Sequence, residues 1–225
     1  MTAIRVATYN VRDLLDDNAA AARTVRAIAP DVLCVQEFPR WVTSLRRMRA
    51  FERETGMTWV GRSWLSGGTT IFTAERAPVA FRRHRHLWVR PLRSPRGYAL
   101  AGVRVEGMPE VVVGSIHLGL FPAERVRHAR QILRRVAGDR PVVLAGDLNE
   151  LDDGAALTEL RTAGGLTVVS PPTPTFRASN PTRRLDVVLA SRQLVPVDGP
   201  TVDLSVEDLV AASDHRPTWA DLGLA

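Results

Sequence analysis

The chain has 225 residues, 45% of them hydrophobic, which is enough to bury the core of one soluble domain or two very small ones. No apolar run reaches the roughly 18 residues of a membrane-spanning helix. A single cysteine, Cys34, excludes a disulfide framework and a cysteine-rich zinc site. The net charge of +6 favours polyanionic partners. Every basic residue is Arg, which a coding bias explains more simply than selection for phosphate binding.

The first half of the chain predicts several strands and one helix. A strand is expected at 2–10, and its residues lack the features of a signal peptide, which favours a cytoplasmic protein. The Ala-rich segment 18–30 predicts a helix that Pro30 ends. The continuous apolar run 31–37 is typical of a buried strand, in which Cys34 is a small buried residue. Three further extended segments are predicted at 57–61, 69–73 and 79–89.

The second half contains the helix with the clearest signals. The segment 122–138 has Pro122 in its first turn and Gly138 just after its end. Its apolar residues recur at helical spacing: Val126, Ala129, Leu133 and Val136. Elsewhere the patterns predict a helix at 154–163 and strands at 98–106, 109–119, 140–147, 166–170, 183–191 and 216–222. Strands thus outnumber helices, which indicates a mixed α/β domain with layered sheets.

Polar side chains follow or end several of the predicted strands. They are carboxylates, amides and imidazoles: Asn10, Glu37, His117, Asp147, Asn149, Asp186, Asp214 and His215. Each alone has a structural explanation as a turn former, a helix cap or a buried imidazole bonded to the backbone. Together they predict a site at one edge of a sheet, where ligands commonly bind in α/β folds. The "GDLNELDDG" segment is not a calcium loop, because Leu151 and Asp152 occupy positions that need an oxygen ligand and a glycine.

Six motifs in order carry a family resemblance: "TYNVR", "VQE", "SIHLG", "AGDLNE", "RRLDVVL" and "SDHRP". This set resembles the endonuclease/exonuclease/phosphatase superfamily, which includes DNase I, abasic-site endonucleases of the exonuclease III type, inositol polyphosphate 5-phosphatases and neutral sphingomyelinases. The resemblance runs from residue 8 to 217. It implies one domain over 1–225, built as a four-layered α/β sandwich with two mixed sheets face to face, helices outside and the site at one edge.

The resemblance also implies a divalent metal and an activated water. Hard oxygen ligands suit Mg²⁺ or Mn²⁺. Glu37 is the leading metal ligand, with Asn10 and Asp214 nearby. Asp147 is expected to orient or deprotonate the attacking water, and Asn149 to hold the phosphate or the metal shell.

Further residues are expected at the phosphate. By the resemblance, His215 hydrogen-bonds the phosphate, and Asp186 fixes its tautomer and favours its protonated form. Asp186 is preferred over the adjacent Asp214 because neighbours on an extended segment point to opposite faces. His117 is expected to contact the phosphate or to act as a general acid. Arg96 is a candidate phosphate ligand, with a surface Arg as the alternative.

Two features depart from familiar branches of the superfamily. The segment "IFTAERAPV" stands where many members have a Leu-Ser-Arg-like segment. Thr73 takes the place of the usual Ser, and the Arg is shifted to position 76, as Arg76. The segment between Asn149 and Asp186 is short and contains no recognisable base-pocket element of the abasic-site enzymes. Abasic-site repair is therefore not the first expectation.

A nuclease acting on DNA or RNA is the expected function, and a monomer is assumed. Support comes from the net charge and from the basic segments 81–86 and 90–96. The two segments are equally consistent with solvated loops. The alternative is a hydrolase of a small phosphodiester, a phospholipid head group or a phosphorylated sugar, because the fold does not decide the substrate. Exposed apolar loop tips would favour lipid, but the sequence offers only Trp64 and Leu65. A catalytically inactive binding module is the least expected outcome.

Overall fold

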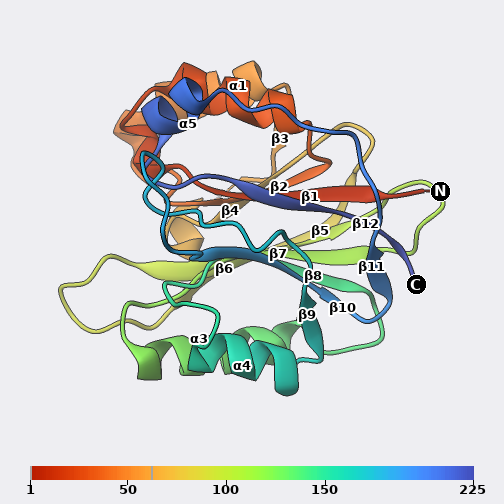
Figure 1. The fold of residues 1–225 in the computed structure, drawn as a ribbon. Coiled ribbons are helices and arrows are strands. Elements are labelled where there is room, and N and C mark those ends of the chain that lie inside the picture. The colour runs from red at the N-terminus through yellow and green to blue at the C-terminus, as the bar shows by residue number, and fades with distance from the viewer. Residues whose placement is uncertain (1, 62) are drawn as a thin grey trace.

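A computed structural model describes residues 2–61 and 63–225 as two six-stranded sheets packed face to face (Figure 1). The first sheet has the order β11 (Leu194–Pro196), β12 (Thr218–Leu224), β1 (Ile4–Asn10), β2 (Val32–Gln36), β4 (Thr70–Thr73) and β3 (Thr58–Trp59). The second has the order β5 (Val79–Leu87), β6 (Arg96–Val103), β7 (Val111–His117), β8 (Val142–Asp147), β10 (Asp186–Ser191) and β9 (Leu166–Val168). Both sheets are mixed, because β1–β2 and β7–β8 are parallel pairs among antiparallel ones.

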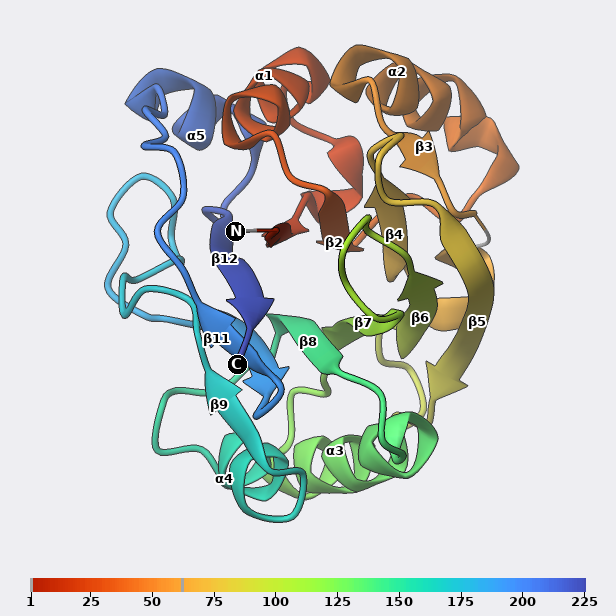
Figure 2. The ribbon, with the colours of Figure 1, turned by 90° about the vertical axis from the view of Figure 1, so that its right-hand side faces the viewer.

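Helices cover the outer faces of both sheets (Figure 2). The first sheet is covered by α1 (Asn18–Ile28), α2 (Leu45–Thr55) and α5 (Val206–Ala212), and the second by α3 (Pro122–Val136) and α4 (Ala155–Thr162). Three short 3₁₀ helices lie in loops: η1 (Arg12–Leu14), η2 (Val42–Ser44) and η3 (Ser63–Ser66). This arrangement confirms the predicted four-layered sandwich. No helix in the described part of the chain is long and apolar enough to cross a membrane.

Three apolar layers hold the sandwich together. The central layer joins the inner faces of the two sheets, with residues such as Val6, Cys34, Val113 and Val143. One outer layer packs the first sheet against α1 and α2, and the other packs the second sheet against α3 and α4. The inner strands β1, β2, β7 and β8 are buried on both faces, which explains their continuous apolar runs.

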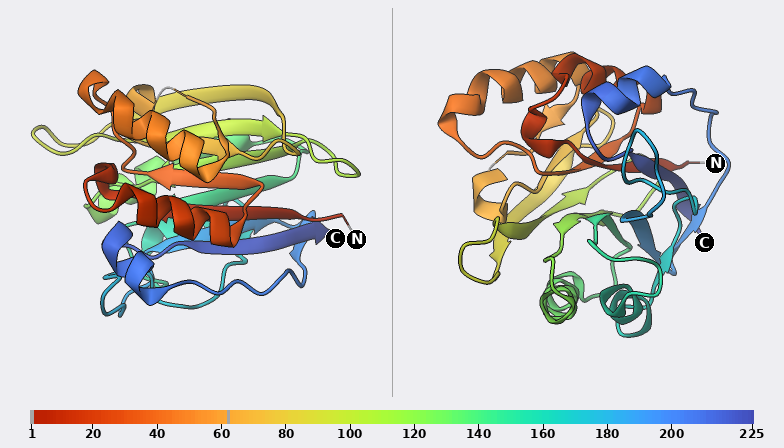
Figure 3. Two further views of the ribbon diagram at one scale, coloured as in Figure 1. Left: turned by 90° about the horizontal axis from the view of Figure 1, so that it is seen from above. Right: turned by 60° about the vertical axis from the view of Figure 1, so that its left-hand side comes forward.

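The strand register gathers the predicted polar residues at one edge of the sandwich. In the first sheet, Asn10 at the end of β1 is opposite Gln36 at the end of β2. In the second sheet, Asp147 at the end of β8 is opposite His117 on one side and Asp186 on the other. The chain termini lie at the other end of the sandwich (Figures 1 and 3). The loops that follow β1, β2, β7 and β8 therefore surround one site.

Most predicted elements are present, and the differences have physical causes. Helix α2 was not predicted, because its low hydropathy conceals three residues that it buries at helical spacing: Met48, Phe51 and Thr55. The short elements β11 and α5 were also not predicted. In α3 the predicted stripe was shifted: Ala129 is buried as expected, but Ile132 is buried with it, whereas Leu133 is only partly buried. The end of α1 agrees, since Ala29 adopts a left-handed conformation just before Pro30.

Candidate active site

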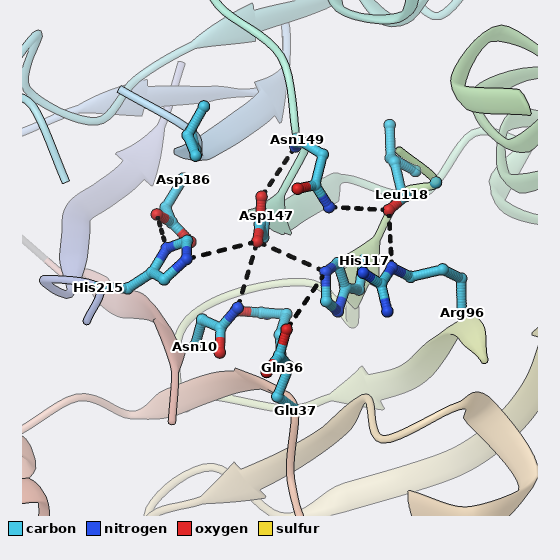
Figure 4. Close-up of polar contacts among 12 residues, drawn as sticks. Asn10, Gln36, Glu37, Arg96, His117, Leu118, Asp147, Asn149, Asp186 and His215 are labelled. Carbon is cyan, nitrogen blue, oxygen red and sulfur yellow. Dashed lines mark hydrogen bonds and ion pairs between the residues drawn. The ribbon is translucent and has the colours of Figure 1, made fainter. Parts of the chain in front are cut away.

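Asp147 lies at the centre of the polar cluster at this edge (Figure 4). It ends β8 and is only 2% exposed. Its Oδ1 accepts a hydrogen bond from the Asn149 backbone N–H at 2.8 Å, and its Oδ2 accepts one from Asn10 Nδ2 at 3.2 Å. The same Oδ2 is 3.4 Å from His117 Nε2 and 3.9 Å from His215 Nε2. Side chains from both sheets therefore converge on one carboxylate.

His215 is paired with Asp186, as predicted. Its Nδ1 lies 2.8 Å from Asp186 Oδ2, which also accepts a hydrogen bond from Thr175 Oγ1 at 2.6 Å. The ring of Phe176 packs on the imidazole with a centroid distance of 4.9 Å. The adjacent Asp214 is half-buried, and among the described residues no hydrogen bond or ion pair involves its carboxylate. Asp214 and His215 are therefore not paired with each other. Because Asp186 holds Nδ1 of His215, the Nε2 atom faces the site.

The charges in this cluster follow from burial and from neighbouring groups. Burial, and then the Asp186 carboxylate, raise the pKa of Asp147 to about 7. Burial lowers the pKa of His215, but the carboxylates of Asp186, Asp147 and Asp214 together outweigh it and raise that pKa to about 9. Burial and the positive charges of Arg96 and His215 hold the pKa of His117 well below its usual value. Near neutral pH the site therefore contains an imidazolium, a neutral imidazole and a carboxyl group close to its titration midpoint.

His117 and Arg96 border the cluster on the β6–β7 side. Neither ring nitrogen of His117 forms a hydrogen bond with the described residues, although the side chain is buried. A buried imidazole without a partner is costly, which suits a group that bonds a ligand. The Leu118 carbonyl accepts hydrogen bonds from Arg96 Nε at 3.1 Å and from Asn149 Nδ2 at 3.0 Å. Among the described residues no carboxylate forms an ion pair with Arg96, so its positive charge is available to an anion.

Glu37 faces this cluster from the first sheet. Its Oε1 is 4.0 Å from His117 Nε2, and its side chain is 34% exposed, so solvent reaches it. Glu37 and Asn149 both adopt left-handed backbone conformations, with φ of 50° and 54°. Such conformations in residues other than Gly are uncommon and concentrate at functional sites.

The donor set at this edge fits a hard divalent cation. The backbone carbonyl of Glu37 accepts a hydrogen bond from the Asp13 N–H, but its carboxylate accepts none from the described residues and is available as a ligand. Among the described residues, Asn10 Oδ1 accepts a hydrogen bond only from the backbone N–H of Arg12, at 3.1 Å. Asp147, Asp186 and His215 also offer ligand atoms within 4.8 Å of one another, but these atoms largely bond each other. The carboxylate and amide oxygens suit Mg²⁺ or Mn²⁺, with Glu37 as the most available ligand.

The buried Asp147 carboxyl is expected to reduce stability above neutral pH. Its folded pKa is raised above the ordinary 3.8, so the folded state binds this proton more tightly and loses stability as pH rises from about 4 to 7. Asp147→Asn has no such titration. In EDTA at pH 8 its free energy of unfolding should exceed that of the unsubstituted protein by about 1–4 kcal/mol. Urea denaturation at pH 4 and pH 8 measures this, and a difference that does not grow with pH would contradict it.

Two residues named from the sequence lie away from the site, and two residues without a predicted role support it. Thr73 and Arg76 lie at the opposite edge, where Arg76 forms an ion pair with Asp31. Thr175 supports the pairing of Asp186, but it follows a Pro-rich segment that gives no signal of this role. Gln36, in the "VQE" motif, had no expected role. Its amide bonds Thr8 Oγ1 and Ser115 Oγ, at 3.0 and 3.1 Å, and so joins the two sheets beneath the site.

Comparison with known proteins identifies the fold and a family. The sequence profile of the Endonuclease/Exonuclease/phosphatase family matches residues 7–215. An endonuclease/exonuclease/phosphatase from Bacteroides vulgatus has a similar structure, with a TM-score of 0.80, 19% identity and full coverage of both chains. The mannosyl-6-phosphatase of Bacteroides thetaiotaomicron has a TM-score of 0.77 and 15% identity, covering 98% of this chain and 100% of its own. The human Nocturnin catalytic domain has a TM-score of 0.74 and 17% identity, covering 99% of this chain and 95% of its own. No curated protein matches the sequence significantly.

Proposed function

Because the chain belongs to the endonuclease/exonuclease/phosphatase family, whose members are hydrolases of phosphate esters, we propose that it is a divalent-metal-dependent phosphodiesterase. The observation that carries the proposal is the buried Asp147 carboxylate, which is surrounded by groups able to bind a phosphate and has a pKa of about 7. A general base is most effective when its pKa lies near the working pH. The surrounding cationic and imidazole groups oppose the repulsion between an anionic phosphate and its nucleophile.

Each side chain has a proposed role in hydrolysis. Asp147 takes a proton from water as the water oxygen bonds to phosphorus and the bond to the leaving oxygen breaks. The leaving oxygen then takes a proton from solvent. The imidazolium of His215 donates from Nε2 to a non-bridging phosphate oxygen, and Asp186 holds it charged and oriented. Neutral His117 contacts the phosphate; its lowered pKa makes this role better supported than that of a general acid. Arg96 and Asn149, both anchored on the Leu118 carbonyl, bind phosphate oxygens.

A bound Mg²⁺ or Mn²⁺ would neutralise phosphate charge and stabilise the leaving oxygen. Glu37 is proposed as its main ligand, with Asn10 and Asp214 as the other candidates. Asp214 is the weakest of the three, because no hydrogen bond or ion pair ties its carboxylate to the cluster among the described residues, whereas Glu37 approaches His117 and Asn10 bonds Asp147.

Glu37→Gln is expected to weaken metal binding by about 10- to 100-fold, because an amide replaces an anionic ligand. Calorimetric titration of the EDTA-treated protein with Mn²⁺ measures the affinity without any substrate. Glu75→Gln is the matched control, since Glu75 is an exposed carboxylate beyond the end of β4 at the opposite edge. Equal Mn²⁺ affinities in the two variants would refute the assignment of Glu37.

Nucleic acid is the first proposed substrate, supported by the net charge of +6 and by the unpaired cation Arg96 at the site. The two basic segments give it unequal support. Residues 81–86 form part of the edge strand β5, where charged side chains have another purpose, because they prevent pairing with other chains. Residues 90–96 lie in the loop that leads to Arg96 and border the site.

A phospholipid head group or small phosphodiester is the second candidate, and it is favoured by exposed apolar side chains in loops beside the site, among them Trp41, Trp64 and Leu92. A substrate panel separates the candidates: plasmid DNA, single-stranded DNA, RNA, bis-p-nitrophenyl phosphate, inositol phosphates and phospholipid vesicles, each with Mg²⁺, Mn²⁺ or EDTA. Cleavage of DNA or RNA supports the nuclease. Activity confined to lipid or small esters would refute it.

A further inference from the structure

Three loop segments at the site edge form one continuous surface, here called the apolar-basic lip: residues 38–47, 63–68 and 87–96. The first two are joined by hydrogen bonds from the Phe38 N–H to the Gly68 carbonyl, at 2.8 Å, and from Ser63 Oγ to the Pro39 carbonyl, at 2.8 Å. The second and third are in direct contact. A Cβ at Gly67 would lie 2.7 Å from the backbone of Arg96.

The lip concentrates exposed apolar side chains. Fourteen large hydrophobic residues are exposed in the described part of the chain, and half of them belong to these short segments. They are Trp41, Val42, Leu45, Trp64, Leu65, Trp88 and Leu92. Exposed apolar residues gathered in one region mark an interaction surface, whereas scattered ones need no explanation. The sequence had indicated only two of these side chains as a candidate apolar tip.

The lip is also positively charged. Its three segments contain no Asp or Glu. Arg40 and Arg93 form no ion pair with any described residue, and the guanidinium of Arg93 instead lies over the Phe121 ring at 5.5 Å. Arg90 is 3.6 Å from Glu124, a buried residue of α3. The surface therefore combines apolar tips with cations, Arg40 and Arg93, that no acidic neighbour among the described residues neutralises.

Leu92 shows that this exposure is built into the backbone. It follows Pro91 at the tip of the β5–β6 loop, is fully exposed, and has a φ of 63°. That turn position ordinarily holds Gly or Asn, because a branched apolar residue is strained there. The loop projects beyond the ends of the sheets on the site side (Figures 1 and 3). A disfavoured residue with no packing partner is expected to have a function outside the folded chain.

We propose that the apolar-basic lip docks the protein on a bilayer that contains anionic phospholipid, with the site facing the membrane surface. Leu and Trp tips enter the boundary between head groups and acyl chains, while the Arg residues attract anionic head groups. Charge complementarity and the aliphatic tips favour this partner over single-stranded nucleic acid. A nucleic acid needs free aromatic faces for base stacking, but Leu92 and Val42 have none, and the Arg127 guanidinium covers the Trp88 ring at 4.3 Å.

The ends of the lip lie next to the candidate site, which explains why docking would bring a membrane to it. Arg96 ends the third segment of the lip and is anchored on the Leu118 carbonyl inside the site. The first segment begins immediately after Glu37. A bilayer held by the lip would therefore present phosphate groups next to the proposed phosphate and metal ligands, as the second substrate candidate, a phospholipid head group, requires. Docking itself does not depend on the proposed hydrolysis, so the two are tested separately.

Sedimentation with vesicles tests the proposal. The full chain should bind vesicles of mixed phosphatidylcholine and phosphatidylglycerol, and bind pure phosphatidylcholine more weakly. Leu92→Asp should weaken binding about tenfold or more, because the substitution removes an inserted side chain and adds a repelled charge. Asp tolerates the left-handed backbone, so this change adds no strain. Leu224→Asp is the matched control, since Leu224 is exposed at the opposite edge and should leave binding unchanged.

Two further readouts separate docking from other effects. Leu92→Asp should leave hydrolysis of soluble bis-p-nitrophenyl phosphate unchanged, because Leu92 touches no proposed catalytic residue. Failure of the protein to hydrolyse any ester would refute the proposed function but not vesicle binding. The docking proposal is refuted if the protein does not bind anionic vesicles or if Leu92→Asp binds as tightly as Leu224→Asp. It is also refuted if the substitution abolishes oligonucleotide binding and spares vesicle binding.

Discussion

Asp147→Asn is expected to lower kcat by about 10²- to 10⁴-fold, the usual contribution of a general base. An amide nearly preserves the shape of the side chain and its hydrogen bond from the Asn149 backbone, but it cannot take a proton from water. Substrate binding should change much less than kcat, because the contacts proposed for the phosphate come from other residues. Steady-state kinetics on the best substrate of the panel measure both quantities.

The matched control for Asp147→Asn is Asp153→Asn, an exposed carboxylate in the loop that follows the same strand. It should retain normal kcat. Thermal unfolding of both variants checks that the fold is intact. A near-normal kcat for Asp147→Asn in a folded protein would remove Asp147 from the chemistry, and an equal loss in Asp153→Asn would show a general effect of lost charge.

His215→Ala is expected to lower kcat/KM by about 10²- to 10³-fold, as does the removal of one donor to a developing negative charge. Asp186→Asn should also lower it, but through His215, because Asp186 is a positioning residue that holds the imidazole charged and oriented. The two substitutions should therefore not be additive: the double variant should be about as slow as His215→Ala.

The pH profile distinguishes this coupling from a structural defect. Without Asp186 the pKa of His215 should fall from about 9, because the carboxylate that opposes the effect of burial is gone. The deficit of Asp186→Asn should then be largest at high pH and shrink as pH falls and His215 becomes protonated. Asp208→Asn, which removes a surface carboxylate paired with Arg23, is the control. Additive losses, or a deficit independent of pH, would contradict the pairing.

Local sequence patterns could predict much of the fold. The strands β1, β2, β7 and β8 are buried on both faces, so their apolar runs are continuous, and the polar residues at their ends mark one edge. The sheet order could not be predicted in this way. Strands β8 and β10 are adjacent in the sheet, yet more than 35 residues separate them in the chain, and no sequence pattern predicted their pairing.

The sequence predicted the side chains of the candidate site, but it did not predict the residues that support them or the surface that surrounds them. His215 and Asp186 are paired as expected, whereas Thr175, which bonds the same carboxylate, is one Thr in a Pro-rich loop. Sequence also could not predict the apolar-basic lip, because its three segments are far apart in the chain and meet only through the folded loops. Exposure of Leu92 depends on a turn conformation that its own sequence disfavours.

The most direct test of a metal-dependent phosphodiesterase is the rate of phosphodiester hydrolysis in EDTA and after metal addition, measured on every substrate of the panel. We predict no turnover in EDTA, recovery on addition of Mg²⁺ or Mn²⁺, and a higher metal requirement for Glu37→Gln than for Glu75→Gln. A rate in EDTA equal to the rate with metal, or no hydrolysis of any phosphate ester with either metal, would contradict the account.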